Sequence, residues 1–255
     1  MPIVGKTDTG KQRKMNEDTF FAEKIANLYL AAVCDGVGGA RGGNVASSTA
    51  IRDFAETFKN ASQALVSKNY LEILIAAVTS ANEAVFLTTV ARPELRGMGT
   101  TMVAFVFDTE TSEYYVANVG DSRLYLIDDK NYTLTQITKD HSHVQELVED
   151  GKMTKEEAES SPLKNIITRV LGVDEEVKID WFKAKYESGL FLLCSDGLTD
   201  YVKESDIKKY VAQYDDLEHC ANELIAKANE NGGGDNITAV IVKPYGSNNQ
   251  ALETN

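Results

Sequence analysis

The sequence has little of what marks several common protein classes. Its three cysteines, Cys34, Cys194 and Cys220, form no CxxC pair, and an odd number of thiols without an export signal predicts reduced cysteines in the cytoplasm. Basic residues are also scarce, because 26 Lys and Arg against 39 Asp and Glu leave a net charge of −13. We therefore expect no broad basic face, and neither nucleic acid nor a membrane surface as a partner.

Long uncharged apolar runs are missing as well. The N-terminal stretch MPIVGKTDTG lacks the basic-then-apolar build of an export signal. No apolar stretch reaches the roughly 18 residues that a membrane helix needs. The nearest one, residues 71–87, carries Glu72 and Glu83 and is typical of an amphipathic helix. With 255 residues, 43% of them hydrophobic, the chain is long enough to bury a sizeable core.

The pattern of the chain mixes strands and helices. Strands are expected over 18–25, 28–34, 101–107, 113–119, 122–127, 177–182, 189–195 and 237–243. Helices are expected over about 44–60, 70–92, 204–212 and 216–230, the first capped by Asn44, with two short helices within 140–165. Short turns between consecutive strands favour antiparallel pairing. We expect one domain of the α+β class, residues 1–245, and a frayed polar tail over 246–255.

One short pattern recurs where apolar runs meet glycine. AAVCDGVGGARGG joins such a run to a glycine-rich stretch through Asp35, and LFLLCSDGLTD repeats the arrangement at Asp196. GGGDNITAVIV reverses the order around Asp235. A single Asp-Gly pair has an ordinary explanation as turn chemistry. Three aspartates where buried strands meet loose turns indicate something more, because they converge if the strands share one sheet edge.

Converging carboxylates favour a metal site. Like charges a few Å apart raise one another's pKa unless a cation neutralises them, and hard divalent ions such as Mg²⁺ and Mn²⁺ prefer carboxylates, carbonyls and water. Gly36 would let a backbone carbonyl turn toward such an ion, since no Cβ stands in the way. Spacing alone leaves the turn interpretation open beside the metal site.

Other phosphate-handling motifs do not fit the glycine-rich stretch. No Gly-Lys-Ser/Thr occurs, which excludes a Walker loop, and Arg41 stands where a dinucleotide fingerprint needs its last glycine. The Cys-x5-Arg cradle of cysteine-dependent phosphatases fails too, because six residues separate Cys34 from Arg41. Cys34 also lies within the apolar run, where a thiol is usually inert.

The segment KQRKMNEDTF adds charged candidates upstream. Arg13 can bind two phosphate oxygens with its guanidinium fork, and Glu17 and Asp18 can hold water molecules around an ion. A charged surface loop explains the same segment equally simply. Asp121, in the Gly120-Asp121 turn between two expected strands, is by itself only a turn residue.

Taken together and in order, the motifs resemble a known family, the metal-dependent protein phosphatases of the PPM (PP2C) type, in their compact bacterial form. The likeness runs from about residue 3 to 243. It is carried by Arg13-x-x-Asn16-Glu17-Asp18, Asp35-Gly36-Val37-Gly38-Gly39, Gly97-Met98-Gly99-Thr100-Thr101, Val119-Gly120-Asp121-Ser122-Arg123, Asp140-His141-Ser142, Ser195-Asp196-Gly197 and Gly234-Asp235-Asn236.

The resemblance implies a four-layer αββα sandwich, two antiparallel sheets packed face to face with helix pairs outside. It also implies two Mg²⁺ or Mn²⁺ ions, one held by Asp35, Asp196 and Asp235. Asp35 bridges to the second ion, which the carbonyl of Gly36 also holds. A third, weaker ion would use Asp121 and Asp196.

The remaining roles that the resemblance implies concern the substrate and the reaction. Arg13 would grip the phosphate, Glu17 and Asp18 would surround the metal-bound waters, and an activated water would attack phosphorus directly. Residues 140–168 match a flap near the active site, which we expect to be mobile and to affect substrate choice.

This sequence departs from many eukaryotic members at one position. Those members carry a histidine after Asp-Gly that is proposed to protonate the leaving oxygen, whereas this chain has Val37, as bacterial members do. The leaving-group acid is therefore unassigned, with a water on the third ion as one candidate. His141 and His143 are expected to be surface or capping residues, and His219 to be solvated.

The sequence thus predicts a cytoplasmic, metal-dependent phosphatase of phosphoserine and phosphothreonine in proteins. We expect it to be a monomer that opposes a bacterial Ser/Thr kinase. A narrower anti-anti-sigma-type phosphatase and a catalytically silent phosphoprotein-binding relative remain as alternatives. Intact Arg13, Asp35, Asp196 and Asp235 argue against the silent relative.

Overall fold

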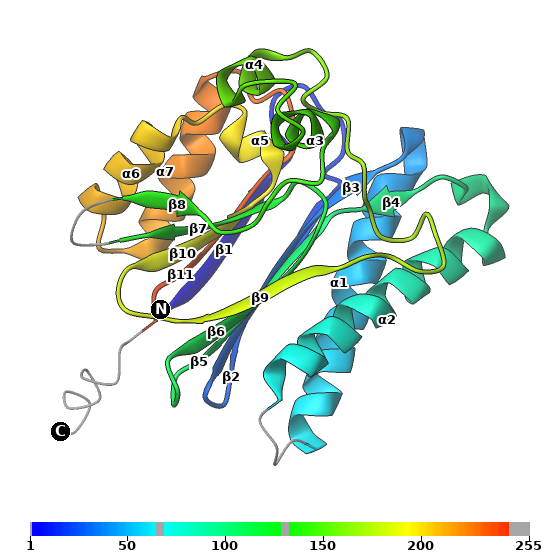
Figure 1. Cartoon of the computed structure of the whole chain (residues 1–255), viewed down its shortest axis with the longest axis horizontal. Coiled ribbons are helices and arrows are strands. Elements are labelled where there is room, and N and C mark those ends of the chain that lie inside the picture. The colour runs from blue at the N-terminus through cyan, green and yellow to red at the C-terminus, as the bar shows by residue number, and fades with distance from the viewer. Residues whose placement is uncertain (1, 65–68, 129–132, 245–255) are drawn as a thin grey trace.

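Two antiparallel sheets, packed face to face and flanked by helices, make up the protein (Figure 1). The structure is a computed structural model that describes residues 2–64, 69–128 and 133–244. The polar tail predicted over 246–255 lies outside the described residues.

Every strand pair in both sheets is antiparallel. The first sheet has the order β1 (Ile3–Asp8), β11 (Ile237–Val242), β10 (Leu190–Cys194), β7 (Arg123–Ile127) and β8 (Leu134–Gln136). The second sheet has the order β2 (Asp18–Ile25), β3 (Leu28–Val37), β5 (Met102–Asp108), β6 (Glu113–Val119) and β9 (Asp180–Lys185), and the short β4 (Gly99–Thr100) pairs with β3.

Helices cover the outer face of each sheet, and shorter ones lie near the sheet ends (Figure 1). The helices are α1 (Gly39–Ala64), α2 (Tyr70–Ala91), the 3₁₀ turn η1 (Pro93–Leu95), α3 (His143–Glu149), α4 (Lys155–Ser160), α5 (Asp196–Thr199), α6 (Glu204–Gln213) and α7 (Leu217–Glu230). The pair α1 and α2 packs on the second sheet, and α6 and α7 lie on the first. The predicted four-layer αββα sandwich is confirmed.

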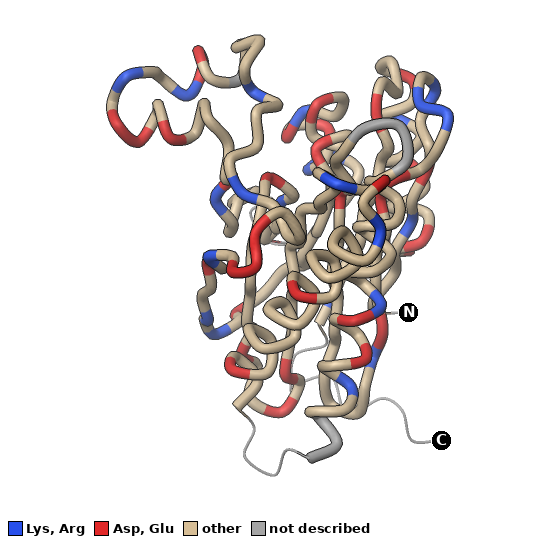
Figure 2. The backbone as a smooth tube through the Cα atoms, turned by 90° about the vertical axis from the view of Figure 1, so that its right-hand side faces the viewer, with Lys and Arg blue, Asp and Glu red and all other residues tan. Residues whose placement is uncertain are grey.

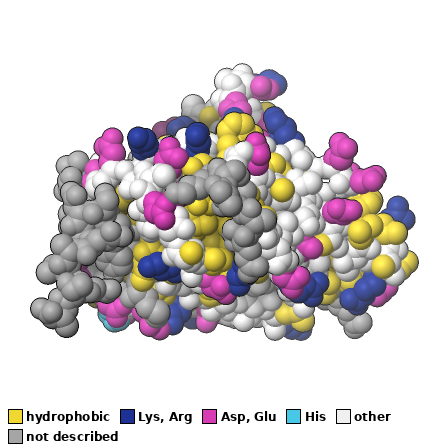
Figure 3. All heavy atoms as spheres, turned by 90° about the horizontal axis from the view of Figure 1, so that it is seen from below, with side chains coloured by type: hydrophobic (Ala, Val, Ile, Leu, Met, Phe, Trp, Pro, Cys, Tyr) yellow, Lys and Arg dark blue, Asp and Glu magenta, His cyan; other side chains and the backbone are white. Residues whose placement is uncertain are grey.

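Three apolar layers hold the sandwich together. Phe54 and Leu74 belong to the layer between α1, α2 and the second sheet, Leu224 to the layer under α7, and Phe105 and Phe191 to the layer between the sheets, with ring centroids 4.6 Å apart. Figure 3, which views the molecule from below, shows apolar side chains reaching the surface among bordering charged ones. Burial on both faces explains why the central strands β3, β5, β6, β10 and β11 are nearly continuous apolar runs.

The helix α2 is long and apolar enough to cross a membrane by length and composition alone. It nevertheless has an ordinary place in the core, because Leu74, Val78, Ala81 and Val85 are fully buried within the layer shared with α1 and the second sheet. The helix predicted over about 70–92 is confirmed, and core packing accounts for its apolar composition. Its amphipathic character is not, because Leu87 and Val90 are exposed, and the expectation that no apolar stretch is long enough to cross a membrane was wrong.

Three details of the predicted elements were wrong. The helix α1 begins at Gly39 rather than after a cap at Asn44, which lies inside the helix. The strand predicted over 177–182 begins only at Asp180. The strand β7 does not continue the sheet of β6 but pairs with β10 and β8 in the other sheet, so the turn before it is a crossover between sheets.

Candidate metal centre

Two of the predicted carboxylates enter from the second sheet. Asp18 opens β2 and lies directly across from Asp35, near the end of β3. Thr100 and Thr101 hold the backbone of Asp35 in place. The Asp35 N–H donates to Thr101 Oγ1 at 2.9 Å, and its carbonyl accepts from Thr100 Oγ1 and from the Thr101 N–H, both at 2.8 Å. The Gly-Thr-Thr motif therefore fixes where the Asp35 side chain begins.

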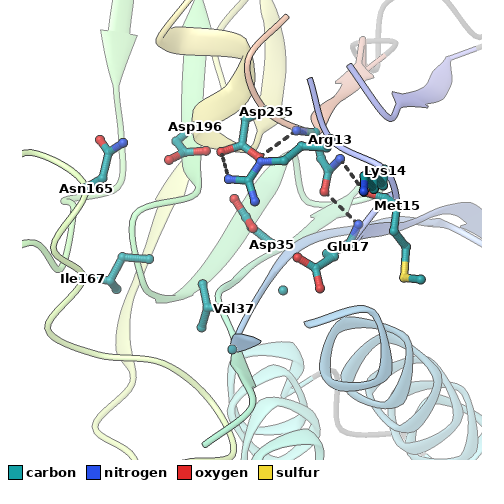
Figure 4. A pocket seen from close by; sticks show the side chains of 13 residues that line it. Arg13, Lys14, Met15, Glu17, Asp35, Val37, Asn165, Ile167, Asp196 and Asp235 are labelled. Atoms are coloured by element: carbon teal, nitrogen blue, oxygen red, sulfur yellow. Dashed lines mark hydrogen bonds and ion pairs between the residues drawn. The ribbon is translucent and has the colours of Figure 1, made fainter. Parts of the chain in front are cut away.

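The other two carboxylates enter from the first sheet. Asp196 starts α5 immediately after β10, and Asp235 stands just before β11. A single shared sheet edge, the condition under which the sequence would bring the three aspartates together, is not what unites them, because β10 and β11 belong to one sheet and β3 to the other. They meet at the same end of two facing sheets, and Figure 4 shows the carboxylates of Asp35, Asp196 and Asp235 directed toward one another.

A cavity of about 720 Å³ opens over these carboxylates. Its lining includes Arg13, Lys14, Met15, Glu17, Asp35, Gly36, Val37, Asn165, Ile167, Asp196, Asp235 and Asn236. Asn165 and Ile167 come from the segment predicted as a flap, so this segment forms one wall of the cavity (Figure 4). Neither Asp18 nor Asp121 lines it.

Arg13 reaches across the cavity to one of the carboxylates. Its Nη2 atom donates to Asp235 Oδ2 at 2.7 Å, while about half of the Arg13 side chain stays exposed. Burial lowers the pKa of Arg13, but attraction to Asp235, Asp35 and Glu17 outweighs that effect and raises it overall. The guanidinium is thus charged and borders the open space, as a phosphate-binding group requires.

Asp18 lies behind the cavity and ties the two sheets together. Its Oδ2 atom accepts hydrogen bonds from Ser195 Oγ and Thr238 Oγ1, both at 2.7 Å, and both partners belong to the first sheet or its end. The other oxygen, Oδ1, is buried with no hydrogen-bond partner. Thr238 had no signal in the sequence, because it reads as one more residue of an apolar strand.

Burial and crowding disturb the acid–base behaviour of the cluster. Loss of solvation, followed by repulsion among the aspartates, raises the pKa of Asp18 to about 7 and keeps that of Asp35 well above its ordinary value. The same causes raise the pKa of Asp196 to about 6 and that of Asp121 to about 8. Clustered carboxylates whose pKa values are raised by burial and mutual repulsion are typical of sites that bind a cation.

Asp121 sits at the crossover between the sheets. Gly120, with a φ of +104°, makes the turn, and its N–H donates to His141 Nδ1 at 2.9 Å. On the other side Arg123 binds both carboxylate oxygens of Asp140, at distances from 2.6 to 3.1 Å. Contacts on both sides therefore hold the turn that presents Asp121.

The histidines lie outside the cavity lining. His141 is buried rather than at the surface, because it is packed against the crossover and its Nε2 lies 3.2 Å from Asp180 Oδ2, so the surface prediction was wrong. His143 is half-buried at the start of α3, and His219 is exposed against the ring of Tyr214. Val37 does line the cavity, and its side chain carries no proton to donate.

Asn236 has a structural role that its place in the Asp-Asn motif did not reveal. Its Oδ1 accepts from the N–H of Glu17 at 2.8 Å, and its Nδ2 donates to the carbonyls of Thr9 and Met15, both at 2.9 Å. One side chain thereby fixes the loop that carries Arg13 and Glu17 to the start of β11.

The chain also matches a family model. The model for protein phosphatase 2C covers residues 7–229. The chain belongs to the protein phosphatase 2C family. The serine/threonine phosphatase stp of Listeria monocytogenes serotype 4b (strain F2365) is 39% identical over 240 residues, which are 93% of this chain and 94% of that protein.

Solved structures of protein phosphatase 2C relatives share the whole fold. Serine/threonine phosphatase Stp1 from Staphylococcus aureus has a TM-score of 0.87 at 34% identity, covering 96% of this chain and 95% of that one. The catalytic domain of PstP in complex with 2 manganese ions has a TM-score of 0.81 at 34% identity, covering 94% and 96%.

The residues of this chain fit divalent cations by their chemistry. Asp196 Oδ1 is buried without a hydrogen-bond partner, and the cluster combines hard oxygen donors with raised pKa values. Within the described residues, no three acidic, histidine or cysteine side chains already stand in a ligand arrangement. Arg13, which pairs with Asp235, supplies positive charge beside these carboxylates.

The backbone at Gly36 is equally adapted to a close approach. A Cβ built there would lie 2.2 Å from the carbonyl oxygen of Gly43 and 2.7 Å from that of Glu17. Any side chain at this position would therefore push β3 away from the start of α1.

Proposed function

We propose that this protein is a Mn²⁺- or Mg²⁺-dependent phosphatase that removes phosphate from serine and threonine side chains of proteins. The observation that carries the proposal is the convergence of Asp35, Asp196 and Asp235, with Arg13, on one open cavity at the end of the sandwich. Membership of the protein phosphatase 2C family supports the same reaction. Relatives of similar length named serine/threonine phosphatases support the choice of substrate.

The carboxylates have distinct proposed roles. Asp35 lies between Asp196 and the loop of Glu17, and we assign it to bridge two ions, with Asp196, Asp235 and the carbonyl of Gly36 completing the set. Divalent cations held by these residues would supply a water of lowered pKa, able to attack phosphorus near neutral pH, and would offset the charge of the phosphate. Any proton on Asp35, whose pKa burial and neighbouring carboxylates raise well above its ordinary value, must leave before an ion binds there.

Arg13 and the residues beside it prepare the substrate. The Arg13 fork binds two phosphate oxygens, and its pair with Asp235 holds the side chain over the cavity until the substrate arrives. Glu17 and Asp18 are proposed to hydrogen-bond water around the ions, Glu17 from the cavity wall and Asp18 from behind. Its two hydroxyl partners keep the Asp18 carboxylate in place.

A third, weaker ion at Asp121 and Asp196 is part of the proposal. Asp121 is buried and Asp196 is half-buried, and the charge of Asp196 is among the causes that raise the pKa of Asp121. Val37 leaves the leaving oxygen without a side-chain acid, so water near Asp121 is the proposed proton donor.

Cysteine content and charge are the basis for a proposed location and proposed partners in the cell. Three buried, unpaired cysteines suit a reducing cytoplasm. A net charge of −13, with basic positions interspersed among acidic ones on the side shown in Figure 2, gives no reason to expect nucleic acid or a membrane. We also propose that the protein is a monomer and that a Ser/Thr kinase supplies the phosphoproteins.

Turnover of p-nitrophenyl phosphate and of a phosphothreonine peptide, with and without Mn²⁺, tests the proposal. We expect Mn²⁺-dependent hydrolysis that falls by at least about 100-fold in Asp196→Asn, since one buried ligand charge is lost. Asp174→Asn, which changes an exposed carboxylate outside the cavity, is the matched control. Peptide binding without any turnover in the unaltered protein would instead establish the silent, phosphoprotein-binding alternative.

The identity of the natural substrate needs a cellular comparison. Phosphoproteomes of a strain lacking the protein and of a strain carrying Asp35→Asn should show the same set of accumulated phosphoproteins. A set reduced to one small phosphoprotein would favour the narrower, anti-anti-sigma-type role.

A further inference from the structure

The strand β9 leaves one edge of the second sheet open. It is the last strand in the order and pairs only with β6, and within the described residues no strand pairs with its outer edge. Figure 1 shows β9 crossing in front of β5 and β6. Free N–H and C=O groups along such an edge can accept another extended chain as an additional strand.

The two faces of β9 differ in chemistry. Trp181, Lys183 and Lys185 are exposed on one face, whereas Phe182 and Ala184 pack into the layer between the sheets. Trp181 is the single tryptophan of the chain and is 56% exposed. Among the described residues neither lysine has an ion-pair partner within 4 Å, although Glu113 lies opposite Lys185 on β6.

A second cavity, of about 180 Å³, lies beside the first residues of β9. It is lined by Val116, Asn118, Ile137, Thr138, Lys139, Asp180, Trp181 and Phe182. This volume is below the roughly 300–1,000 Å³ of small-molecule pockets and suits a single large side chain. Asn118 is 3% exposed, and its Oδ1 has no hydrogen-bond partner, so a buried acceptor also borders this space.

We propose that β9 docks an extended segment of the phosphoprotein substrate in which acidic and apolar residues alternate. The inference rests on the phosphatase activity proposed above. Side chains of an added strand point alternately to the two faces of the sheet. An apolar side chain on the inner face would enter the second cavity, and acidic side chains on the outer face would lie beside Lys183 and Lys185.

The docking strand lies within reach of the catalytic cavity. Asp180, the first residue of β9, pairs with Asn118, which precedes the Asp121 crossover by three positions, so β9 begins at the carboxylate end of the sheet. Four strand spacings of about 4.8 Å separate a strand added outside β9 from β3, which carries Asp35, or about 19 Å in all. About five extended residues between the phosphorylated residue and the docking segment span that distance.

Charge argues against a second copy of this chain as the occupant. Pairing of β9 with another β9 would bring exposed lysines of the two strands close together, and facing like charges destabilise a sheet. Lysines on an edge strand discourage such self-pairing in general. In a protein of net charge −13, the same lysines select for an acidic partner strand.

Two phosphothreonine peptides of equal composition test the docking strand. In one, a Glu-Phe-Glu-Phe segment follows the phosphothreonine after five residues, and in the other the segment is Glu-Glu-Phe-Phe. We expect kcat/KM to be about tenfold higher for the alternating peptide, through KM, which corresponds to about 1.4 kcal/mol. The double variant Lys183→Glu, Lys185→Glu should lose that preference, and Lys209→Glu on α6 should keep it.

Turnover of p-nitrophenyl phosphate, which is too small to reach β9, should be the same in all three proteins. Equal kcat/KM for the two peptides, or a preference that survives the double charge reversal, would overturn the docking strand while phosphatase activity stands. Concentration-dependent dimerisation that Lys183→Glu changes would assign β9 to self-association and would also overturn it.

A binding measurement separates docking from catalysis. Because Trp181 is the single tryptophan, its fluorescence should change when the unphosphorylated alternating peptide is added, and less so with the shuffled peptide. Docking seen in a protein that hydrolyses no phosphate ester would refute the proposed activity and keep the binding strand. Hydrolysis without a fluorescence response would refute docking on β9 and leave the proposed phosphatase activity standing.

Discussion

Mild acidification of the metal-free protein from pH 8 to 6.5 is expected to stabilise the fold. Burial and repulsion raise the pKa of Asp18 to about 7, of Asp196 to about 6 and of Asp121 to about 8, from an ordinary 3.8. Between these values and 3.8 the folded chain binds more protons than the unfolded chain. The free energy of unfolding therefore rises as the pH falls.

The printed pKa values set the size of this effect. At pH 7 the three aspartates together hold about one to two more protons in the folded chain. Each proton changes the free energy of unfolding by about 1.4 kcal/mol per pH unit, so the slope is about 2 kcal/mol per unit. Over the range from 8 to 6.5 the melting temperature should rise by about 5–10 °C. The lowered pKa of buried His141 acts in the opposite sense at lower pH, which sets the acid limit of the range.

Thermal melts followed by circular dichroism, in a chelator and in saturating Mn²⁺, measure the effect. The ions must displace the bound protons, so the Mn²⁺-induced rise in melting temperature should be larger at pH 8 than at pH 6.5. Asp121→Asn should flatten the pH slope of the metal-free protein, because Asp121 has the largest of the three raised pKa values, and Asp174→Asn should leave it unchanged. A metal-free melting temperature that increases with pH, or a Mn²⁺ effect independent of pH, would refute the reasoning.

Three further changes probe single residues of the centre. Gly36→Ala places a Cβ 2.2 Å from the Gly43 carbonyl, so Mn²⁺-dependent activity should fall at least about tenfold for a stability loss of about 1–3 kcal/mol, measured by urea titration. Arg13→Ala should raise KM for p-nitrophenyl phosphate about 10- to 100-fold, and Arg13→Lys should restore part of it, because the fork but not the charge is lost. An unchanged KM would speak against phosphate binding by Arg13. Asp121→Ala should impair turnover while calorimetry still finds two Mn²⁺ per chain, and loss of all bound Mn²⁺ would contradict separate roles.

The sequence alone predicted most carboxylates of the metal centre, because each lies in a short sequence pattern that can be recognised locally. Asp35 and Asp196 each end an apolar run at a glycine, and Asp235 precedes one, so their positions at strand ends followed from the pattern of burial. The hairpin of β2 and β3 was equally local, since two apolar strands flank the Ala26-Asn27 turn, where Ala26 adopts a φ of +52°.

What the sequence could not show depends on pairing between distant segments. Side chains alternate between the two faces of a strand in the same way in either sheet. The local sequence therefore did not show that β7 leaves the sheet of β6 at Gly120. For the same reason, nothing local showed that Asp35 and Asp196 approach each other from two different sheets. His141 looked polar and terminal in the sequence, yet the crossover buries it by supplying a backbone N–H for its ring.

The placement of the carboxylates on two different sheets has a consequence for how activity arises. A growing chain that has completed β6 holds Asp18 and Asp35, but Asp196 and Asp235 are still to be made. No half of the molecule contains a usable centre, so hydrolysis can begin only when the two halves have closed on each other. Catalytic turnover would then report directly on complete assembly. Two fragments separated by a cut between β6 and Asp196 should each be inactive, and turnover should return when they are mixed.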